Sequence, residues 1–466
     1  MTPRMPNPFQ AIASATREVG KSLARFWASL DTRVGDRRSQ RKFANFVPGP
    51  QAAGRSFLFL QGPQSPFLRR LGLAMDALGV RVTKINFCGG DVFHWPRPHA
   101  LSYRGARVDW PAFVAAVMER RQVTDLVLMG DRRPLHHDAI CLARARGITI
   151  HVLEEGYLRP SYITLEQNGV NANSPLPATP EAIRAQAAVT PEPPTLHHIV
   201  DSMPTRVYAT IKHHLGNALL WSGFPRYRTH RPYCIGRELL GWLPRYVTRK
   251  RRRRQAEQIV RTFSAAHSPF FLFPLQLDSD MQIRSYSHFG VLDSIMRVVG
   301  SFAAAAPAGC RLLVKNHPLD NGLINLRRYL DNFSRAAGIA DRIVYIDGGP
   351  GRYIMDNPGC RGVVVVNSTM GLEAMALGLP VYSLGRSPYA MPGLAVTPEE
   401  MSLEDFWSTP RPVDMDLLSG FIRILHARAL VPGNFYTDVG IAAAVSGMLK
   451  RLGLGSLRSG EEEPPC

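Results

Sequence analysis

The stretch Ile148-Thr149-Ile150-His151-Val152-Leu153-Glu154-Glu155-Gly156-Tyr157 decides the fold of this chain. Its first six residues are mostly apolar and β-branched, as in a buried strand, and two carboxylates follow them directly. A second apolar run, residues 311–315, ends just as directly in Asn316-His317-Pro318. In open α/β sheets, ligands bind outside the carboxyl ends of the strands. We therefore predict a two-lobed enzyme in which two sheets direct polar groups into one cleft.

Short apolar runs alternate with helical lengths through both halves of the chain. Each run ends in a polar or glycine-containing loop, which is typical of βα units in a parallel sheet. Two Rossmann-like domains are therefore predicted. The expected strands are 57–60, 80–87, 125–129, 148–153, 270–274, 311–315, 343–346, 362–366 and 380–384, and the expected helices include 67–78, 137–146 and 372–377.

Length and composition indicate a globular protein with large cores. The 466 residues are 45% hydrophobic, which suits roughly two or three domains. The six cysteines form no CxxC pair, so neither a zinc site nor a disulfide framework is predicted. No apolar run is long enough to span a bilayer, and no secretory leader is recognisable at the N-terminus. We expect a cytoplasmic protein with reduced thiols.

The formal net charge of +19 calls for an anionic partner. Residues up to about 47 have the spacing of an amphipathic basic helix, with a solvated or packed basic arm as the equal alternative. Aromatic and basic residues interleave over 202–256, which ends in six cations at 249–254. That run is either a solvated face or a contact with an anionic surface. Because aromatic and polybasic segments suit acidic bilayers, we rank lipid above nucleic acid.

These composition changes define the predicted domains. The proline-rich stretch 175–194 indicates a boundary or crossover between the two sheets. We predict a basic N-terminal arm (1–50), a Rossmann-like domain (51–195), a helical aromatic and basic segment (196–264), a second Rossmann-like domain (265–450) and a flexible tail (451–466).

Several strand ends carry groups suited to catalysis or anion binding. Asn367, Ser368 and Thr369 precede a predicted helix, where backbone N–H groups bind phosphate, although an ordinary N-cap is the alternative. His317, beside Lys315, could donate to the same phosphate. On an extended chain, one of the two adjacent glutamates faces the cleft as a general acid or base, while the other could pair with Arg159. Asp278 and Asp280 form a second carboxylate pair that alone is equally consistent with a turn.

Taken together, these motifs resemble the capsule polysaccharide synthesis and export family, of the single-module KpsS/LipB type. The resemblance spans roughly residues 56–393. It rests on Gln61-Gly62-Pro63, Lys84-Ile85-Asn86-Phe87 with Gly90-Asp91, Gly130-Asp131-Arg132, Glu154-Glu155-Gly156-Tyr157-Leu158-Arg159-Pro160 with Thr164-Leu165-Glu166 and Gly169-Val170-Asn171, Pro274-Leu275-Gln276, Lys315-Asn316-His317-Pro318-Leu319-Asp320 and Asn367-Ser368-Thr369.

This resemblance implies a GT-B-like glycosyltransferase that transfers the acidic sugar Kdo from CMP-Kdo to a phosphatidylglycerol-type lipid. The product would be the β-Kdo linker on which capsule is exported. Retention of configuration is expected, with Asp280 preferred over Asp278 as nucleophile. The implied residues are Glu154, Glu155 and Asp280 for catalysis, Gln276, Lys315, His317, Pro318, Asn367, Ser368 and Thr369 for the donor, and Gln61, Asp131 and Arg159 on the acceptor side.

The same resemblance sets the expected partners. We expect no cofactor and no metal ion, since CMP has a single phosphate that His, hydroxyls and helix N–H groups can hold. Expected partners are CMP-Kdo, an anionic phospholipid acceptor, the inner face of the inner membrane and other capsule synthesis or export proteins, but no nucleic acid. Two alternatives stay open. One is a non-catalytic export component that binds polysaccharide or the transporter, and the other is nucleic-acid binding through 249–254.

Overall fold

The computed structural model describes residues 46–457, except 97–98, 195–197, 230–232, 234, 267, 279–280, 288 and 350. This part of the chain divides into two compact units, and each is described by itself. Unit 1 contains the residues up to Pro175, those between Pro194 and His230, and those from Ala429 on. Unit 2 contains Leu176–Pro193 and Arg231–Arg428.

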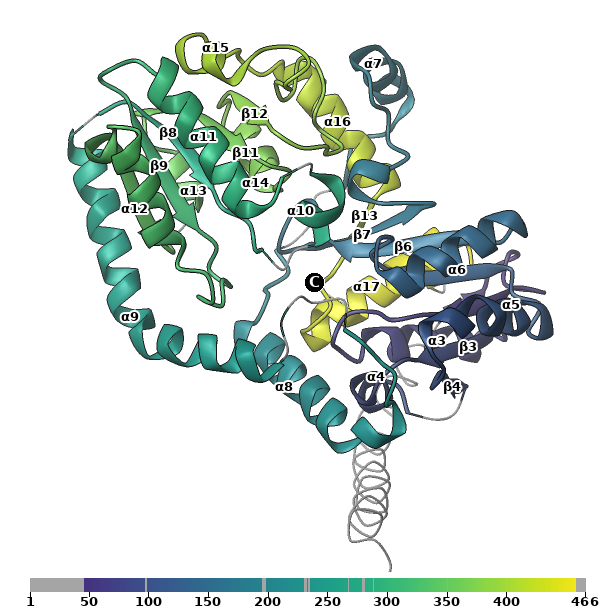
Figure 1. Cartoon of the computed structure of the whole chain (residues 1–466). Helices are drawn as coiled ribbons and strands as arrows, with labels where there is room; N and C mark the ends of the chain where they lie inside the picture. The colour runs from purple at the N-terminus through teal and green to yellow at the C-terminus, as the bar shows by residue number, and fades with distance from the viewer. Residues whose placement is uncertain are drawn as a thin grey trace, which may run out of the picture. The chain divides into compact units, whose positions relative to one another are not determined.

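Unit 1 is built on a seven-stranded sheet in the order β13-β7-β6-β5-β2-β3-β4 (Figure 1). Neighbouring strands from β4 to β6 pair in parallel, as predicted. β7 instead pairs antiparallel with β6, because the chain turns straight back after Glu155 without a crossover helix. The strands are β2 (Ser56–Phe59), β3 (Arg81–Asn86), β4 (Ala100–Ser102), β5 (Asp125–Met129), β6 (Thr149–Glu155), β7 (Tyr162–Gln167) and β13 (Leu430–Pro432).

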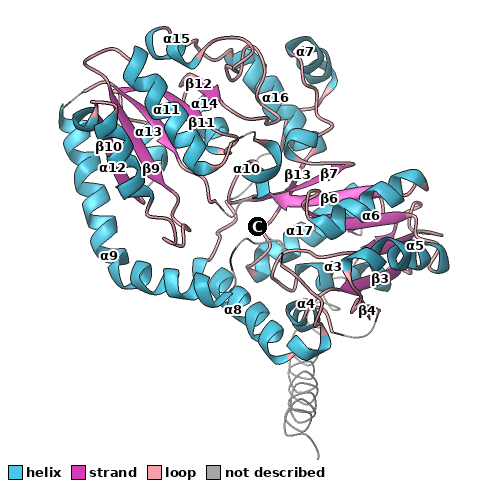
Figure 2. Ribbon diagram, viewed as in Figure 1, coloured by secondary structure: helices cyan, strands magenta, loops and turns pink. Residues whose placement is uncertain are grey.

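Helices cover both faces of this sheet (Figure 2). One face, with Phe57, Phe59 and Leu153, packs against α3 (Phe67–Ala77) and α17 (Asp438–Arg451). Leu58, Val152 and their neighbours on the other face pack against α5 (Trp110–Arg120) and α6 (Pro134–Ala145). Alternate residues of each strand thus enter two separate cores, which is why the strands read as continuous apolar runs. Helices thus hold the sheet on both faces, and loops follow the strands at its carboxyl edge.

Unit 2 has a five-stranded sheet in the order β10-β9-β8-β11-β12, with all neighbours parallel. One face packs on α11, α12 and α15 through a large aromatic core that includes Phe302, Phe406 and Trp407. The elements are β8 (Phe270–Pro274), β9 (Arg311–Asn316), β10 (Ile343–Asp347), β11 (Cys360–Val365), β12 (Val381–Ser383), α7 (Pro180–Val189), α10 (Met281–Tyr286), α11 (Val291–Ala305), α12 (Leu326–Ala336), α13 (Gly351–Met355), α14 (Met370–Met375), α15 (Leu403–Ser408) and α16 (Met415–Arg428).

Two α/β units with parallel sheets and a helical basic segment are therefore confirmed. The predicted segment 196–264 forms α8 (Met203–Leu219), which belongs to unit 1, and α9 (Ile235–Ala266), which belongs to unit 2. Neither these helices nor any other in the described ranges is long and apolar enough to cross a membrane.

The unit boundaries differ from the predicted ones in three places. β13 and α17 return to unit 1, since α17 shares a core with α3, so the domain predicted to end at residue 450 is shorter. α7 belongs to unit 2 because it packs on α16. The predicted flexible tail starts at the last residue of α17 and contains a strand, β14 (Gly455–Leu457), which pairs with β1 (Phe46–Pro48). Of the predicted N-terminal arm, residues 1–45 lie outside the described residues.

Candidate active site

In unit 1, Gln61 lies at the centre of a buried polar network beyond the strand ends. Its Nε2 donates to the Asp91 carboxylate at 3.1 Å and to the Tyr227 hydroxyl at 3.3 Å. Its Oε1 accepts a bond of 3.3 Å from Arg133, which follows β5. Burial would raise the pKa of Asp91, but the neighbouring Lys84 and other donors hold that pKa below its usual value. Gln61 therefore joins the ends of β2, β3 and β5.

Glu154 and Glu155 both lie within β6 rather than after it, where they pair with β7. Glu155 accepts a 2.8 Å hydrogen bond from Arg206 of α8. The same guanidinium contacts Asp201 at 3.1 Å and stacks on the Tyr436 ring at 4.0 Å. The expectation that one of the glutamates pairs with Arg159 is therefore wrong for Glu155, because α8 brings a different arginine to that face of the sheet.

Glu154 points to the other face of β6. Its Oε1 accepts the backbone N–H of the next residue at 3.0 Å. Its Oε2 lies beside Gly130 at the end of β5, where Arg133 also approaches. Gly130 has a φ of 72°, in the left-handed region that favours glycine, and a Cβ there would lie 3.7 Å from both Arg133 Nε and Glu154 Oε2. Glu154 is thus the carboxylate placed at the carboxyl edge of the sheet.

The two other acceptor-side residues have structural partners. Asp131 is buried and accepts a 2.8 Å bond from Asn173, which ties the β5 loop to the turn at Asn171–Asn173. Arg159 donates from Nε to the carbonyl of Gly156 at 3.1 Å, within its own loop. Both residues therefore shape the loops around Glu154.

In unit 2, Gln276 and Asn367 join the ends of β8 and β11. The Gln276 Nε2 donates to Asn367 Oδ1 at 2.8 Å, and its Oε1 accepts the Asn367 backbone N–H at 3.1 Å. Ser368 follows, and its Oγ accepts the Met370 N–H at 3.2 Å, so this hydroxyl binds the first backbone N–H of α14. Thr369 makes no side-chain cap at this helix. The residues predicted to bind the sugar donor at the ends of these two strands are thus brought together at one edge of the sheet.

The His-Pro turn after β9 has a defined imidazole orientation. His317 Nδ1 accepts the Leu319 backbone N–H at 3.0 Å, so a neutral ring carries its proton on Nε2. The His317 backbone N–H in turn donates to Asn316 Oδ1 at 2.8 Å. Lys315 is buried beside the turn, and burial lowers its pKa while the carboxylates Glu373 and Asp347 oppose that shift. Pro318 follows with an exposed side chain. This turn offers N–H and ammonium donors to an anion.

The carboxylates expected after β8 are only partly described. Asp280, the preferred nucleophile, lies outside the described residues. Asp278 accepts a 3.0 Å bond from the Tyr233 hydroxyl, which gives it a structural partner.

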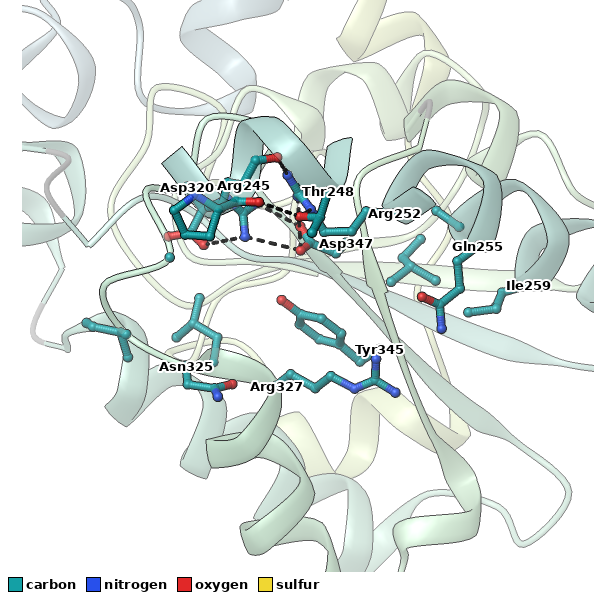
Figure 3. A pocket seen from close by; sticks show the side chains of 16 residues that line it. Arg245, Thr248, Arg252, Gln255, Ile259, Asp320, Asn325, Arg327, Tyr345 and Asp347 are labelled. Atoms are coloured by element: carbon teal, nitrogen blue, oxygen red, sulfur yellow. Dashed lines mark hydrogen bonds and ion pairs between the residues drawn. The ribbon is translucent and has the colours of Figure 1, made fainter. Parts of the chain in front are cut away.

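Sequence patterns missed an ion-pair network at the end of β10. Arg245 of α9 contacts Asp347 at 2.8 Å and Asp320 at 3.3 Å, and Arg252 reaches Asp347 at 3.1 Å. Asn316 Nδ2 donates to both carboxylates, at 3.1 and 3.2 Å. The two arginines and the two aspartates border a cavity of about 350 Å³ between α9 and β10, where both arginines point at Asp347 (Figure 3). Asp320 and Asp347 therefore connect the basic helix α9 to Asn316, the residue next to His317.

Arg133, Arg206 and Asp347 were also not predicted as site residues. Arg206 lies far from Glu155 in sequence, and no pattern relates a helical arginine to a particular strand. Asp347 begins an Asp-Gly-Gly loop at a predicted strand end, which was the one available signal for it.

Comparison with known proteins gives a consistent result. The family described as "Capsule polysaccharide biosynthesis protein" matches residues 124–436. "Capsule polysaccharide export protein KpsS" of Escherichia coli is 30% identical over 390 residues, covering 82% of this chain and 97% of that protein. "Capsule polysaccharide modification protein LipB" of Neisseria meningitidis is 31% identical over 401 residues, covering 83% of this chain and 93% of that protein.

Among solved structures, similarity extends to "KpsC, beta Kdo 2,7 transferase" of Thermosulfurimonas dismutans. It has a TM-score of 0.36 and 12% identity, and the alignment covers 79% of this chain and 99% of that one. A UDP-GlcNAc 2-epimerase of Neisseria meningitidis has a TM-score of 0.31. Both TM-scores are low.

Proposed function

Because the chain belongs to the capsule polysaccharide biosynthesis family, we propose that it is a glycosyltransferase that transfers Kdo from CMP-Kdo to a phosphatidylglycerol-type lipid, starting or extending the β-Kdo linker needed for capsule export. The observation that carries the proposal is the position of Glu154 on β6. Its Oε2 lies beside Gly130 at the carboxyl edge of the sheet, while Glu155 pairs with Arg206. A transferase needs one such positioned carboxylate, while a binding scaffold needs none.

In this reaction Glu154 is the general acid and base. The acceptor hydroxyl loses its proton to Glu154 as its oxygen attacks the sugar, a role that contributes roughly 10²–10⁴-fold to such reactions. The retaining course takes two displacements. Asp280 first attacks the anomeric carbon and CMP leaves, and the acceptor oxygen then displaces the aspartate. The role of Asp280 rests on the family resemblance.

The edge of unit 2 binds the donor. Lys315 and the Nε2–H of His317 suit the CMP phosphate, and Ser368 and Thr369 add hydroxyls. The Gln276–Asn367 amide pair holds the two strand ends in register. The proposed chemistry needs no metal ion, because these groups can balance the charge of a single phosphate.

Two helices support contact with an anionic membrane surface. On α9 the exposed side chains Leu240, Leu243 and Val247 recur at helical spacing, and the exposed Lys250 and Arg254 continue the same face. Arg252 is not part of it, since it turns inward to Asp347. An apolar stripe that continues into cations suits the boundary between acyl chains and anionic headgroups. We propose peripheral attachment to the inner face of the inner membrane.

α8 has a comparable face within unit 1. Met203, Val207, Ile211 and Leu215 recur every four residues and are between 43% and 60% exposed. Trp221, 60% exposed, follows the helix, and indole rings favour membrane interfaces. The opposite side of α8 packs on α4 (Gly89–His94), so the apolar face points outward.

The decisive experiment is mass spectrometry of a short-chain lysophosphatidylglycerol incubated with CMP-Kdo, generated in situ, and the purified protein. We expect a mass gain of one Kdo on the lipid and stoichiometric release of CMP. His317→Ala should lower the rate, while Arg146→Gln, an exposed change on α6's C-terminal side, should not. Intact CMP-Kdo and unmodified lipid in every reaction would refute transfer from this donor and favour the export component that binds polysaccharide or the transporter.

A further inference from the structure

Three side chains with different metal-binding chemistry meet in the interior of unit 1. Cys88 follows β3, Asp91 lies in α4 and His213 lies in α8. All three are buried, and one ligand atom from each lies within 4.8 Å of the others. The Cys88 Sγ is 4.0 Å from His213 Nε2. A buried thiol, carboxylate and imidazole together form the mixed ligand set that suits Zn²⁺ and related transition ions.

Glycines bring these side chains together. A Cβ on Gly89 would lie 2.0 Å from the Gly216 carbonyl oxygen, and one on Gly90 would lie 2.3 Å from His213 Nδ1. Helices α4 and α8 can therefore approach closely only with glycine at these positions. The approach is fixed further by a 2.7 Å bond from the Gly90 N–H to Asn217. Figure 1 shows α4 and α8 side by side.

The ligand orientations are already set by neighbouring groups. Asp91 accepts the Phe87 backbone N–H at 2.9 Å and the Gln61 amide at 3.1 Å. The His94 ring stacks on His213, with centroids 5.7 Å apart and planes at 15°. Partners of this kind, which hold a ligating carboxylate or imidazole in one orientation, are a regular feature of metal sites.

The spacing also fits a small divalent ion. Tetrahedral zinc has Zn–S bonds of about 2.3 Å and Zn–N bonds of about 2.0–2.1 Å, which places the sulfur and nitrogen about 3.6 Å apart. The observed Sγ–Nε2 separation of 4.0 Å is a little wider. A small side-chain rotation closes the difference, and the two anionic ligands balance the charge of the ion.

We propose that Cys88, Asp91 and His213 bind one Zn²⁺-class ion that cross-links α4 to α8. The Cys88 thiol gives its proton to solvent as the sulfur–metal bond forms, and no electron is transferred. The role is structural, so the inference does not depend on the proposed glycosyl transfer. Cysteine spacing could not indicate it, because the ligands come from separate segments that only the fold brings together.

The test uses the tag-free full chain, treated with a chelator and then titrated with Co²⁺, whose bond to a thiolate gives a characteristic charge-transfer absorption. We expect one equivalent to bind, with this absorption present in the wild type and absent in Cys88→Ser. Cys360→Ser is the matched control, since Cys360 is also buried but lies outside the three-residue cluster. His213→Gln should weaken Co²⁺ binding at least tenfold.

A second readout keeps the test valid if Cys88→Ser does not fold. In the wild type, Zn²⁺ should raise the melting temperature and slow alkylation of Cys88 under partially unfolding conditions, as followed by peptide mass spectrometry. The rate of Cys360 alkylation then measures any stabilisation by Zn²⁺ that does not depend on the proposed site. Three outcomes would overturn the proposal. The wild type could lack the thiolate absorption band, folded Cys88→Ser could show the same band, or Zn²⁺ could protect both cysteines equally.

Discussion

Glu154 and Glu155 are neighbours on β6, yet their surroundings differ enough for a kinetic separation. We expect Glu154→Gln to lower the initial rate of CMP release at least about 100-fold, because it removes the proposed acid and base. Glu155→Gln keeps an oxygen that can accept from Arg206, so its rate should stay within about tenfold of wild type while the melting temperature falls. Initial rates and melting curves for both variants check this.

Equal losses in the two variants would place catalysis elsewhere, and a larger loss in Glu155→Gln would reverse the assignment. Arg206→Lys is the companion change. It keeps the positive charge beside Glu155. It loses the planar guanidinium, which also binds Asp201 and stacks on the Tyr436 ring. It should therefore behave like Glu155→Gln.

Asp125 predicts a pH-dependent contribution to stability. It is buried at the start of β5 and accepts bonds from His151 at 2.7 Å, from Thr124 at 2.7 Å and from Arg55 at 2.9 Å. Burial would raise its pKa, but these donors together hold the pKa well below the usual value. A depressed pKa gives stability that is present above the unfolded-state pKa of about 3.9 and is lost as pH falls through the folded-state value.

We expect Asp125→Asn to lower the unfolding free energy by about 3 kcal/mol at neutral pH, because it leaves a partly buried arginine without its partner. The difference from wild type should shrink below about pH 4, where Asp125 of the unfolded wild-type chain begins to protonate while the folded carboxylate is still charged. Urea unfolding at several pH values measures both. Asp438→Asn is the control, since its pair with Arg70 is solvent-exposed and should contribute less than about 1 kcal/mol. A pH-independent difference would contradict the electrostatic explanation.

Residues at strand ends could be predicted from sequence, while their partners could not. A buried strand followed by polar residues locates Glu154, Gln276 and Asn367 at a sheet edge, whatever lies around them. The partner of Glu155 depends on where α8 packs. Arg159 was the nearest arginine in sequence, but it bonds to the Gly156 carbonyl instead. Short-range pairing was the wrong assumption there.

At the scale of elements, the contact between α4 and α8 can be tested through Gly216. A Cβ there would lie 2.7 Å from the Gly89 carbonyl oxygen and 2.8 Å from the Phe93 ring. Gly216→Ala should therefore cost about 1–3 kcal/mol of stability despite alanine's better helix propensity. Gly300→Ala, in α11 with nothing within 4 Å of the added Cβ, should instead stabilise by about 0.5–1 kcal/mol. Denaturant unfolding of both variants gives the comparison, and the same sign for both would refute close packing at Gly216.

Element prediction succeeded where apolar runs were bounded by turn residues. The predicted ranges 125–129 and 270–274 coincide with β5 and β8. β6 was expected to stop at residue 153 but continues through both glutamates, because β7 pairs with them. The placement of α17 in unit 1 follows from side chains such as Ile441 and Met448 entering the core of α3. Periodicity identifies such a helix but carries no information about which sheet it covers.

At the scale of the whole molecule, the net charge of +19 makes binding to anionic surfaces the expected behaviour, and the α9 face gives it a location. The purified protein should sediment with vesicles containing phosphatidylglycerol but not with neutral phosphatidylcholine vesicles. Each cation near an anionic surface contributes about 1 kcal/mol. Replacing Lys250, Arg251 and Arg254 by glutamine should thus weaken binding by roughly 100-fold and flatten its salt dependence.

Charge alone could produce part of this effect, so the control variant carries the same charge change elsewhere. Arg120, Arg121 and Arg146 are exposed in unit 1, and their replacement by glutamine should leave most of the vesicle binding intact. Leu243→Asp should also weaken binding, since lipid contact by α9 places that side chain among the headgroups and acyl chains. Equal losses in the two triple variants would mean that net charge, not this helix, governs attachment. Retention on DNA with no preference for lipid would instead assign the basic run to nucleic acid.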